Sequence, residues 1–217
     1  VEAQEDLMKK TVELERSNKE LEQFAYVASH DLQEPLRMVA SYLQLLERRY
    51  GDRLDGDARD FIDYAVDGAT RMKTLINDLL SFSRVGTRGK AFEPTDLNLV
   101  VKKVRDTLGQ AIKENEAKLV YERLPTVMAD SNQIIQLFQN LISNAIKFHK
   151  PEEPPRVEIS AEETSEGWQI AVSDNGIGIK PDYYERIFII FQRLHTSTEY
   201  PGTGIGLAVS KRIIERH

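Results

Sequence analysis

The sequence has 217 residues, of which 41% are hydrophobic and 29% charged, and its formal net charge at pH 7 is −6. This composition is typical of a soluble globular protein with one large domain or two small ones, and the acidic balance argues against a nucleic-acid surface. The absence of cysteine excludes disulfides and cysteine-ligated metal centres. No apolar run approaches the about 20 residues of a membrane span, and we expect no signal peptide. We therefore expect this part of the protein in the cytoplasm, although the full-length protein could be membrane-anchored.

Residues 1–50 are predicted to form one long helix. Val1 stands inside the helical pattern, so we expect the chain to be a fragment of a longer protein. Leucine or alanine recurs at every seventh residue and mostly polar residues fill the alternate seam, which indicates a weak coiled coil: Leu7, Leu14, Leu21 and Ala28; Gln4, Thr11, Asn18, Ala25 and Leu32. A solvent-exposed helix with incidental leucines is the alternative. Pro35 should bend this helix within a turn of His30, because proline lacks an N–H and crowds the preceding turn.

A second helix is predicted for residues 57–84, after a Gly- and Asp-rich turn at residues 51–57 in which Asp55 or Asp57 could cap it. Its apolar residues recur at helical spacing. Two helices joined by a short turn form an antiparallel hairpin with more apolar surface than one partner helix covers. Pairing of two copies into a four-helix bundle would bury that surface, so we expect a homodimer.

The polar, glycine-rich stretch from Val85 to Lys90 marks a domain boundary. We place one domain at residues 1–85, a linker at 86–91 and a second domain of mixed α and β structure at 92–217. In the second domain we expect helices at 97–115, 130–148 and 204–217, strands at 118–122, 156–161 and 168–173, a short helix from Pro181 and a flexible loop at 192–203. Trp168 is interpreted as a core residue of its strand.

Two glycine-rich segments could approach a nucleotide closely. Asp174-Asn175-Gly176-Ile177-Gly178 directly follows a predicted strand, where glycines permit a tight turn beside the acceptor Asp174. The segment from Gly202 to Leu207 precedes the last helix, whose unpaired N–H groups could bind phosphate. It lacks the Gly-Lys-Ser/Thr ending of a Walker loop and does not follow a strand, so it is neither a Walker nor a Rossmann motif.

Three polar residues share one face of the helix at 130–148. Asn140, Asn144 and Lys147 are spaced by four and three residues. Asparagine oxygens can ligate hydrated Mg²⁺, and a lysine can neutralise phosphate. Taken alone, this helix is better explained by a polar outer face.

Together these segments resemble, in order and spacing, the N, G1 and G2 boxes of the Bergerat-type ATP-binding fold, and Ile187-Phe188-Ile189-Ile190-Phe191 resembles its F box. His30-Asp31 with Pro35 is similar to the H box of a sensor histidine kinase. The resemblance covers the whole chain and is closest to phytochrome-like kinases. It implies a helical hairpin that forms a dimeric four-helix bundle, followed by an α/β sandwich that binds ATP and Mg²⁺.

By this resemblance, His30 accepts the γ-phosphoryl group of ATP and passes it to an aspartate of a response regulator, while Asp31 accepts the ring proton or holds the tautomer. A neutral imidazole is a good nucleophile at physiological pH. The implied nucleotide ligands are Asn140 and Asn144 through Mg²⁺, Lys147 and Arg193 on phosphate, Asp174 on adenine with Gly176 and Gly178 shaping the pocket, and Thr203, Gly204 and Gly206 around the phosphates. Sensor domains upstream of this fragment would supply the signal.

Two departures from the family pattern affect these expectations. Glu34 stands where members with strong phosphatase activity often carry Thr or Asn, which leaves phosphatase activity unassigned. The family also continues beyond the position of His217 into final strands, so we expect the ATP-binding sheet to lack an edge. The scattered His149, His195 and His217 suggest no metal site and are assigned to surface or packing.

Two other functions compete with the kinase. The chain could be a non-catalytic relay and dimerisation module with a vestigial ATP fold, which an intact Asn144, Asp174 and second glycine segment disfavour. It could also be another Bergerat ATPase, such as a chaperone or a mismatch-repair protein. The helical hairpin that contains His30 argues against that alternative.

Overall fold

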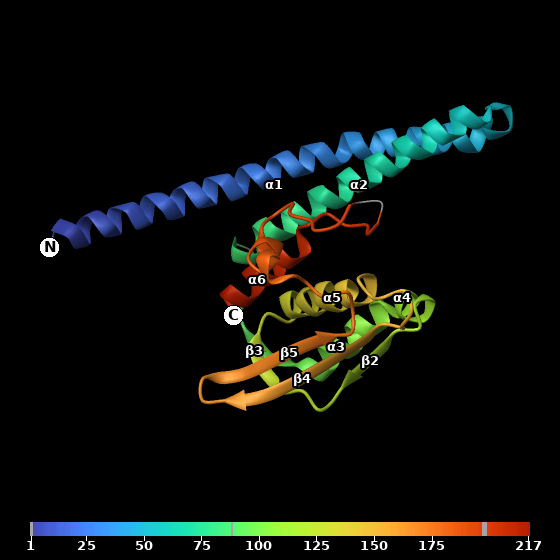
Figure 1. The fold of residues 1–217 in the computed structure, drawn as a ribbon. Coiled ribbons are helices and arrows are strands. Elements are labelled where there is room, and N and C mark those ends of the chain that lie inside the picture. Colours follow the sequence, from blue (N-terminus) through green and yellow to red (C-terminus); the bar gives the residue numbers. More distant parts are fainter. Residues whose placement is uncertain (1, 88, 197–198) are drawn as a thin grey trace. The chain divides into compact units, whose positions relative to one another are not determined.

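The computed structural model describes residues 2–87, 89–196 and 199–217, apart from a number of side chains in the first helix and the side chain of Thr87. The chain divides into two compact units, Val1–Thr87 and Arg88–His217 (Figure 1).

The first unit is a helical hairpin. It consists of α1 (Glu2–Tyr50), a 3₁₀ turn (Gly51–Arg53) and α2 (Gly56–Thr87). The Asp55 carboxylate accepts a hydrogen bond from the Ala58 N–H at 2.8 Å and so provides the predicted cap of α2. A hydrogen bond of 2.8 Å from Gln33 Nε2 to Asn77 Oδ1 joins the two helices. The predicted hairpin is thereby confirmed.

The long helices differ in detail from the prediction. Helix α1 contains Pro35 and continues to Tyr50, as predicted, and the difference lies in α2. Helix α2 ends at Thr87, three residues later than predicted, and includes Val85, the first residue of the polar, glycine-rich stretch. Only 2% of Val85 is exposed. Burial of this apolar side chain favours another turn of helix over a polar loop.

The second unit contains two small sheets and a layer of helices. A two-stranded antiparallel sheet pairs β1 (Glu93–Asp96) with β3 (Thr126–Ala129). In the other sheet, β4 (Arg156–Thr164) lies between β2 (Lys118–Tyr121), which is parallel to it, and β5 (Gly167–Asp174), which is antiparallel. The helices are α3 (Leu97–Thr107), α4 (Gly109–Glu114), α5 (Ser131–Lys147) and α6 (Gly206–Arg216).

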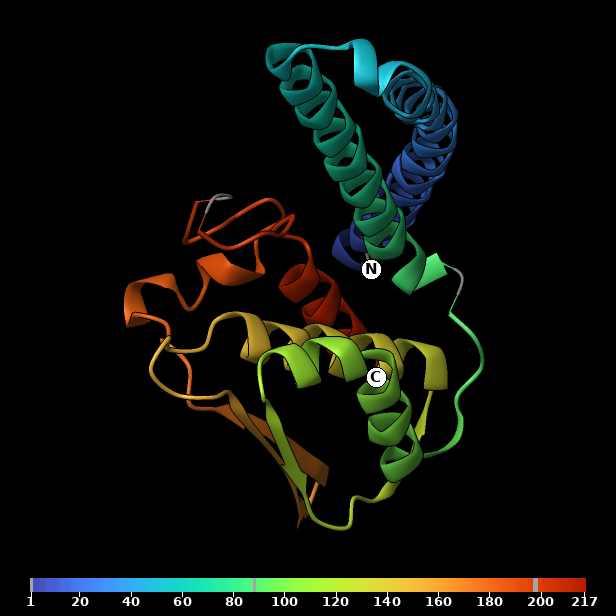
Figure 2. The ribbon, with the colours of Figure 1, turned by 90° about the vertical axis from the view of Figure 1, so that its right-hand side faces the viewer.

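The core of this unit lies between the sheet and the helices, which form a layer over one face of the sheet in both views (Figure 2). Val157 and Ile159 of β4 are buried, whereas the alternate residues Glu158 and Ser160 are exposed, as expected for a sheet covered on one face. Fully buried helix and loop residues complete the core: Val101, Val104, Ile142, Ile205 and Ile213. The predicted α/β domain is confirmed.

Several predicted elements were wrong in detail. The helix at 97–115 is two helices, because the chain leaves helical geometry at Leu108 and Gly109 begins α4. Strands β1 and β3 were not predicted, since each has only four residues and β1 contains a proline. Trp168 lies in β5, but 44% of it is exposed, so it is not a core residue. Helix α6 begins at Gly206, two residues later than predicted.

Candidate functional site

The turn after β5 is held against the end of α5. Asp174 ends the strand, and its Oδ1 accepts a hydrogen bond from the Gly176 N–H at 2.8 Å. The Ile177 N–H donates to the Phe148 carbonyl at 2.9 Å. A Cβ at Gly176 would lie 2.5 Å from that carbonyl oxygen and 2.7 Å from Asp174 Oδ1, so only glycine fits there. The predicted tight turn therefore places an exposed carboxylate beside the helix that bears the asparagines.

Asn175, which the sequence analysis did not select, braces this turn from the other side. Its Oδ1 accepts a hydrogen bond from the Arg156 N–H at 2.8 Å, and its Nδ2 donates to the Pro154 carbonyl at 3.1 Å. These contacts tie the turn to the start of β4. An asparagine directly before the first glycine was the available signal, because Asx side chains commonly stabilise turns.

The asparagine face of α5 meets the start of α6. Asn140, Asn144 and Lys147 are all half-buried. Asn140 Nδ2 donates to the Gly206 carbonyl at 3.1 Å and lies 3.5 Å from Ser210 Oγ. The N–H side of the Asn140 amide thus holds the second glycine segment, and its oxygen is the atom that could ligate a metal.

The second glycine segment follows a backbone path that requires glycine. Gly204 has a φ of +76°, and a Cβ there would lie 2.8 Å from the Gln192 carbonyl. Its own carbonyl accepts a hydrogen bond from the Phe191 N–H at 3.1 Å. Thr203 Oγ1 accepts from the Ile205 N–H at 3.4 Å. These contacts place Thr203 at the approach to the N-terminus of α6, where backbone N–H groups can bind an anion.

Lys147 is a cation in a partly desolvated position. Its Nζ lies 4.2 Å from the centre of the Phe148 ring, and a Cβ at Gly202 would lie 3.2 Å from it. Burial lowers the pKa of Lys147, and the positive charge of Arg193 lowers it further. An anion placed between Lys147 and Arg193 would relieve both effects. This predicted phosphate-binding pair therefore lies together in the fold.

Aromatic residues that were not predicted as functional connect the loop before α6 to the end of α5. The rings of Phe148 and Tyr200 are 4.8 Å apart, and the His195 ring is 5.1 Å from that of Tyr200. Arg193 Nη2 donates to the Tyr200 carbonyl at 2.7 Å. His195 was assigned to surface or packing, and its ring packs on Tyr200, which gave no sequence signal beyond its own ring. Residues 197 and 198 of this loop lie outside the described residues.

The predicted phosphoacceptor belongs to the other unit. His30 is part of helix α1, but its side chain lies outside the described residues, and Asp31 beside it is exposed. Glu34 forms a two-point ion pair with Arg37, with distances of 3.0 and 2.7 Å to Arg37 Nε and Nη2. The pKa of Arg37 is raised by this hydrogen bond and by the Glu34 charge. Glu34 thus has a local partner on its own helix.

The donor set fits a nucleotide with its metal better than a free metal ion. Among the described residues, no group of three or more His, Cys, Asp or Glu side chains could hold a metal by itself. Instead, Asn140, Asn144 and the half-buried Lys147 share one face of α5, and Asn140 contacts Gly206 at the start of α6. Mg²⁺ commonly takes most of its ligands from phosphates and water, so the convergence of Asn140, Asn144 and Lys147 suits a metal that arrives with a triphosphate.

Comparison with known protein families matches both units. The His Kinase A (phospho-acceptor) domain matches residues 20–88, which include His30. The Histidine kinase-, DNA gyrase B-, and HSP90-like ATPase family matches residues 129–217, which include all the predicted nucleotide ligands. The chain belongs to the sensor histidine kinases. The joint presence of the two domains distinguishes this kinase from other ATPases of the same fold, and the predicted resemblance is confirmed.

Curated relatives of the kinase include cyanobacterial phytochromes. Cyanobacterial phytochrome A of Nostoc sp. is 56% identical over 94% of this chain and 27% of its own length. Phytochrome-like protein Cph1 of Synechocystis sp. is 51% identical over 98% of this chain and 28% of its own length. The kinase thus spans little more than a quarter of the length of these relatives.

Solved structures agree with the fold. Full-length ShkA in complex with AMPPNP has a TM-score of 0.66 and 27% identity to the kinase, covering 88% of this chain and 40% of that one. The nucleotide-free catalytic domain of histidine kinase ThkA has a TM-score of 0.51 and 26% identity, covering 58% of this chain and 82% of that one. Within the described residues, no helix of the kinase is long and apolar enough to cross a membrane.

Proposed function

We propose that this kinase transfers the γ-phosphoryl group of ATP to His30 and then to an aspartate of a response regulator. The observation that carries the proposal is the convergence of the three predicted motif segments in the second unit: Asn140 contacts Gly206, Lys147 adjoins Gly202, and Phe148 binds the turn after Asp174. Relatives that share most of this chain include a methanogenesis regulatory histidine kinase of Methanothrix harundinacea, at 33% identity.

In the first step, a ring nitrogen of His30 attacks the γ-phosphorus of ATP. The new N–P bond forms as the bond between the γ-phosphorus and the bridging oxygen breaks, and ADP leaves. Asp31 accepts the ring proton or holds the reactive tautomer. In the second step, a carboxylate oxygen of the regulator attacks the same phosphorus, and the His30 ring becomes the leaving group.

The residues of the second unit bind and orient the nucleotide. Asp174 accepts a hydrogen bond from the adenine amino group, with Gly176 and Gly178 shaping its pocket. Lys147 and Arg193 neutralise phosphate charge, and Thr203, Gly204 and Gly206 present backbone and hydroxyl groups to the phosphates. Asn140 and Asn144 would hold Mg²⁺, which would supply further charge neutralisation. Positioning and charge neutralisation account for most of the catalysis in such transfers.

Two partners belong to the proposal: a second copy of the chain, which completes a four-helix bundle, and the receiver domain of a response regulator. The proposal does not include phosphatase activity toward the regulator. Glu34 stands at the position where family members with strong phosphatase activity often carry Thr or Asn, and it pairs with Arg37. Among the residues that the structure describes, no observation favours the second candidate, a non-catalytic relay.

The test is incubation of the 217-residue chain with γ-labelled ATP and Mg²⁺, beside His30→Gln and Asn144→Asp. We expect an acid-labile, base-stable label on the wild type and none on His30→Gln. Asn144→Asp should lose the label because its carboxylate alters the metal site, while its His30 is intact. Label that persists in His30→Gln, or that is acid-stable, would contradict the phosphohistidine. A wild type that binds nucleotide but takes up no label would favour the relay.

A further inference from the structure

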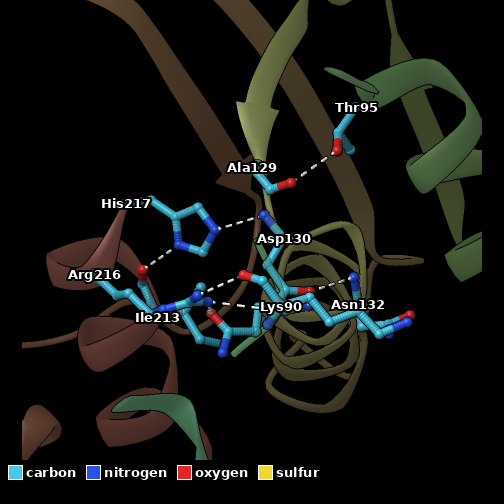
Figure 3. A network of polar contacts seen from close by, with 9 residues as sticks. Lys90, Thr95, Ala129, Asp130, Asn132, Ile213, Arg216 and His217 are labelled. Carbon is cyan, nitrogen blue, oxygen red and sulfur yellow. Dashed lines mark hydrogen bonds and ion pairs between the residues drawn. The ribbon is translucent and has the colours of Figure 1, made fainter. Parts of the chain in front are cut away.

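The chain that enters the second unit is held by side chains from the start of α5 and the end of α6. Lys90 precedes β1 and lies in no helix or strand. Its N–H donates to Asp130 Oδ2 at 2.7 Å, and its carbonyl accepts a hydrogen bond from Arg216 Nη2 at 2.7 Å (Figure 3). Both backbone polar groups of this loop residue are therefore bound by side chains distant in sequence.

Arg216 connects the backbone of Lys90 with the start of α5 and with Phe92. Its Nη1 lies 3.3 Å from Asp130 Oδ2 and donates to Gln133 Oε1 at 2.6 Å. Its guanidinium lies 5.0 Å from the centre of the Phe92 ring. The Asp130 side chain is only 3% exposed and that of Arg216 21%. An ion pair that is shielded from water and shares several hydrogen bonds holds its partners more firmly than an exposed pair.

Asp130 and His217 complete the arrangement at the start of α5. Asp130 Oδ1 caps the helix by accepting from the Asn132 and Gln133 N–H groups. The Asp130 N–H donates to His217 Nε2 at 3.0 Å, while His217 Nδ1 donates to the Ile213 carbonyl at 2.7 Å. The His217 ring also stacks on Phe92, with centroids 4.6 Å apart. We call the set Asp130, Arg216 and His217, which holds Lys90 and Phe92, the linker clamp.

We propose that the linker clamp sets the length of the tether between the two units and thereby positions the bound nucleotide for transfer to His30. Helix α2 ends at Thr87, so the clamp at Lys90 leaves only residues 88 and 89 between fixed points. With the clamp open, the next fixed element is β1, which begins at Glu93, and the tether becomes residues 88–92. Three more extended residues add about 10 Å of reach.

This inference rests on the proposed function, because tether length matters only if the two units react with each other. Transfer between tethered groups depends on their effective concentration, which falls with about the −3/2 power of the length of a flexible tether. Lengthening from two residues to five therefore lowers the transfer rate about fourfold. Nucleotide affinity should hold, because Asn140, Asn144 and Lys147 lie about three to five helical turns beyond the capped end of α5.

The chain offers a way to open the clamp without replacing Arg216. A Cβ at Gly89 would overlap the Arg216 guanidinium. Gly89→Ala should therefore displace the guanidinium from Lys90, since the end of a long side chain moves more easily than backbone. Gly109→Ala is the matched control, because a Cβ at that position in α4 meets no atom within 4 Å.

The experiment compares Arg216→Ala, Gly89→Ala and Gly109→Ala with the wild type in the 217-residue chain. Three quantities are measured: the rate of His30 phosphorylation at saturating ATP, the equilibrium Kd of a non-hydrolysable ATP analogue, and hydrogen exchange of the Lys90 amide. We expect Arg216→Ala and Gly89→Ala to lower the rate about fourfold, to change Kd less than twofold and to speed exchange at Lys90 at least tenfold, while Gly109→Ala changes none of them.

Three results would overturn the proposal. An unchanged rate despite faster Lys90 exchange would show that tether length does not govern transfer. A loss of nucleotide affinity as large as the loss of rate would show that the linker clamp acts only by stabilising α5. Unchanged exchange at Lys90 would show that the clamp does not fix the linker. A wild type that forms no phosphohistidine would instead refute the proposed function. Hydrogen exchange of the Lys90 amide would then still show whether the linker clamp fixes the linker.

Discussion

At the scale of single residues, Asp130 shows how one carboxylate can serve several elements. Burial raises the pKa of Asp130, but hydrogen bonds from the Lys90, Gln133 and Asn132 N–H groups and from Arg216 outweigh it, so the net pKa is lowered. The ionised form is therefore the one that the fold stabilises. Because the folded pKa is depressed, this stabilisation is complete above the ordinary value of 3.8 and disappears as the pH falls below it.

We expect Asp130→Asn to lower the free energy of unfolding by about 2 kcal/mol at pH 7, because the amide removes an ionised acceptor from a buried, multiply bonded position. The difference from wild type should shrink as the pH falls below about 4, where the carboxylate becomes protonated. Urea unfolding at pH 7, 5 and 3 measures both effects. Asp106→Asn, at an exposed position of α3, is the control, and a difference that is independent of pH would contradict the charge-based account.

Lys147 is the opposite case, because the fold of the free protein disfavours the charged form of its side chain. Its lowered pKa means that the unfolded chain binds the proton more tightly, so the stability of the free protein should rise as the pH climbs from that lowered pKa toward 10.5. A phosphate beside Lys147 would raise the pKa again. The cost of burying the ammonium is then recovered only when an anion binds.

We therefore expect Lys147→Met to weaken binding of an ATP analogue at least tenfold, the order of one charge-assisted hydrogen bond, without lowering the free energy of unfolding of the free protein. Isothermal titration calorimetry and urea unfolding measure the two quantities. Lys113→Met, at an exposed position of α4, should change neither. A marked loss of stability in Lys147→Met would show that this lysine is a structural residue.

At the scale of elements, the site depends on how the end of α5 meets the turn after β5. The Phe148 carbonyl, just beyond the last helical residue, accepts the Ile177 N–H, and the Asp174 carboxylate folds back onto the Gly176 N–H. The turn is therefore shaped by close backbone contacts and by Asx-type bonding. No larger side chain can enter this contact without moving the helix or the carboxylate.

Gly176→Ala should disrupt this junction, because its Cβ would overlap a backbone carbonyl and Asp174 Oδ1. We expect a loss of about 1–3 kcal/mol in the free energy of unfolding and at least a tenfold loss of nucleotide affinity. Analogue binding and urea unfolding provide the measurements, with Gly109→Ala again as the matched substitution in open space. Wild-type affinity in Gly176→Ala would exclude Asp174 as the adenine-binding residue, provided that the variant is folded.

At the scale of the whole molecule, the helical hairpin leaves a stripe of apolar side chains exposed. Leu32, Val39 and Leu46 of α1 follow one another at intervals of seven residues. Their exposed fractions are 54%, 50% and 46%, respectively. On α2, Phe61 and Tyr64 are 69% and 72% exposed. Residues with this spacing on long helices are typical of a seam between helices, and a second hairpin would cover them.

We accordingly expect the chain to be a dimer at micromolar concentration and the double variant Val39→Glu with Leu46→Glu to be a monomer. Each substitution removes an apolar contact of about 1.5–3 kcal/mol and places a charge in the seam. Sedimentation equilibrium gives the masses. Leu99→Glu, at an exposed apolar residue of α3, should remain dimeric. A monomeric wild type would contradict the predicted four-helix bundle.

Much of this protein is determined by local patterns in the sequence. Helical periodicity predicted both long helices, and the spacing of Asn140, Asn144 and Lys147 predicted that their side chains share a face of α5. The glycines at 176 and 204 predicted tight backbone paths. Such features depend on residues near one another in the chain, because helix geometry and steric restriction act locally.

The tertiary structure alone decided which of these segments meet. Nothing local to His217 or Arg216 indicates that they bind the cap of α5 or the backbone of Lys90, which is 126 residues away from Arg216. The four-residue strands β1 and β3 and the exposure of Trp168 were also beyond the sequence patterns. Contacts between distant segments depend on the packing of the whole unit, and short strands acquire their stability from partners that periodicity does not identify.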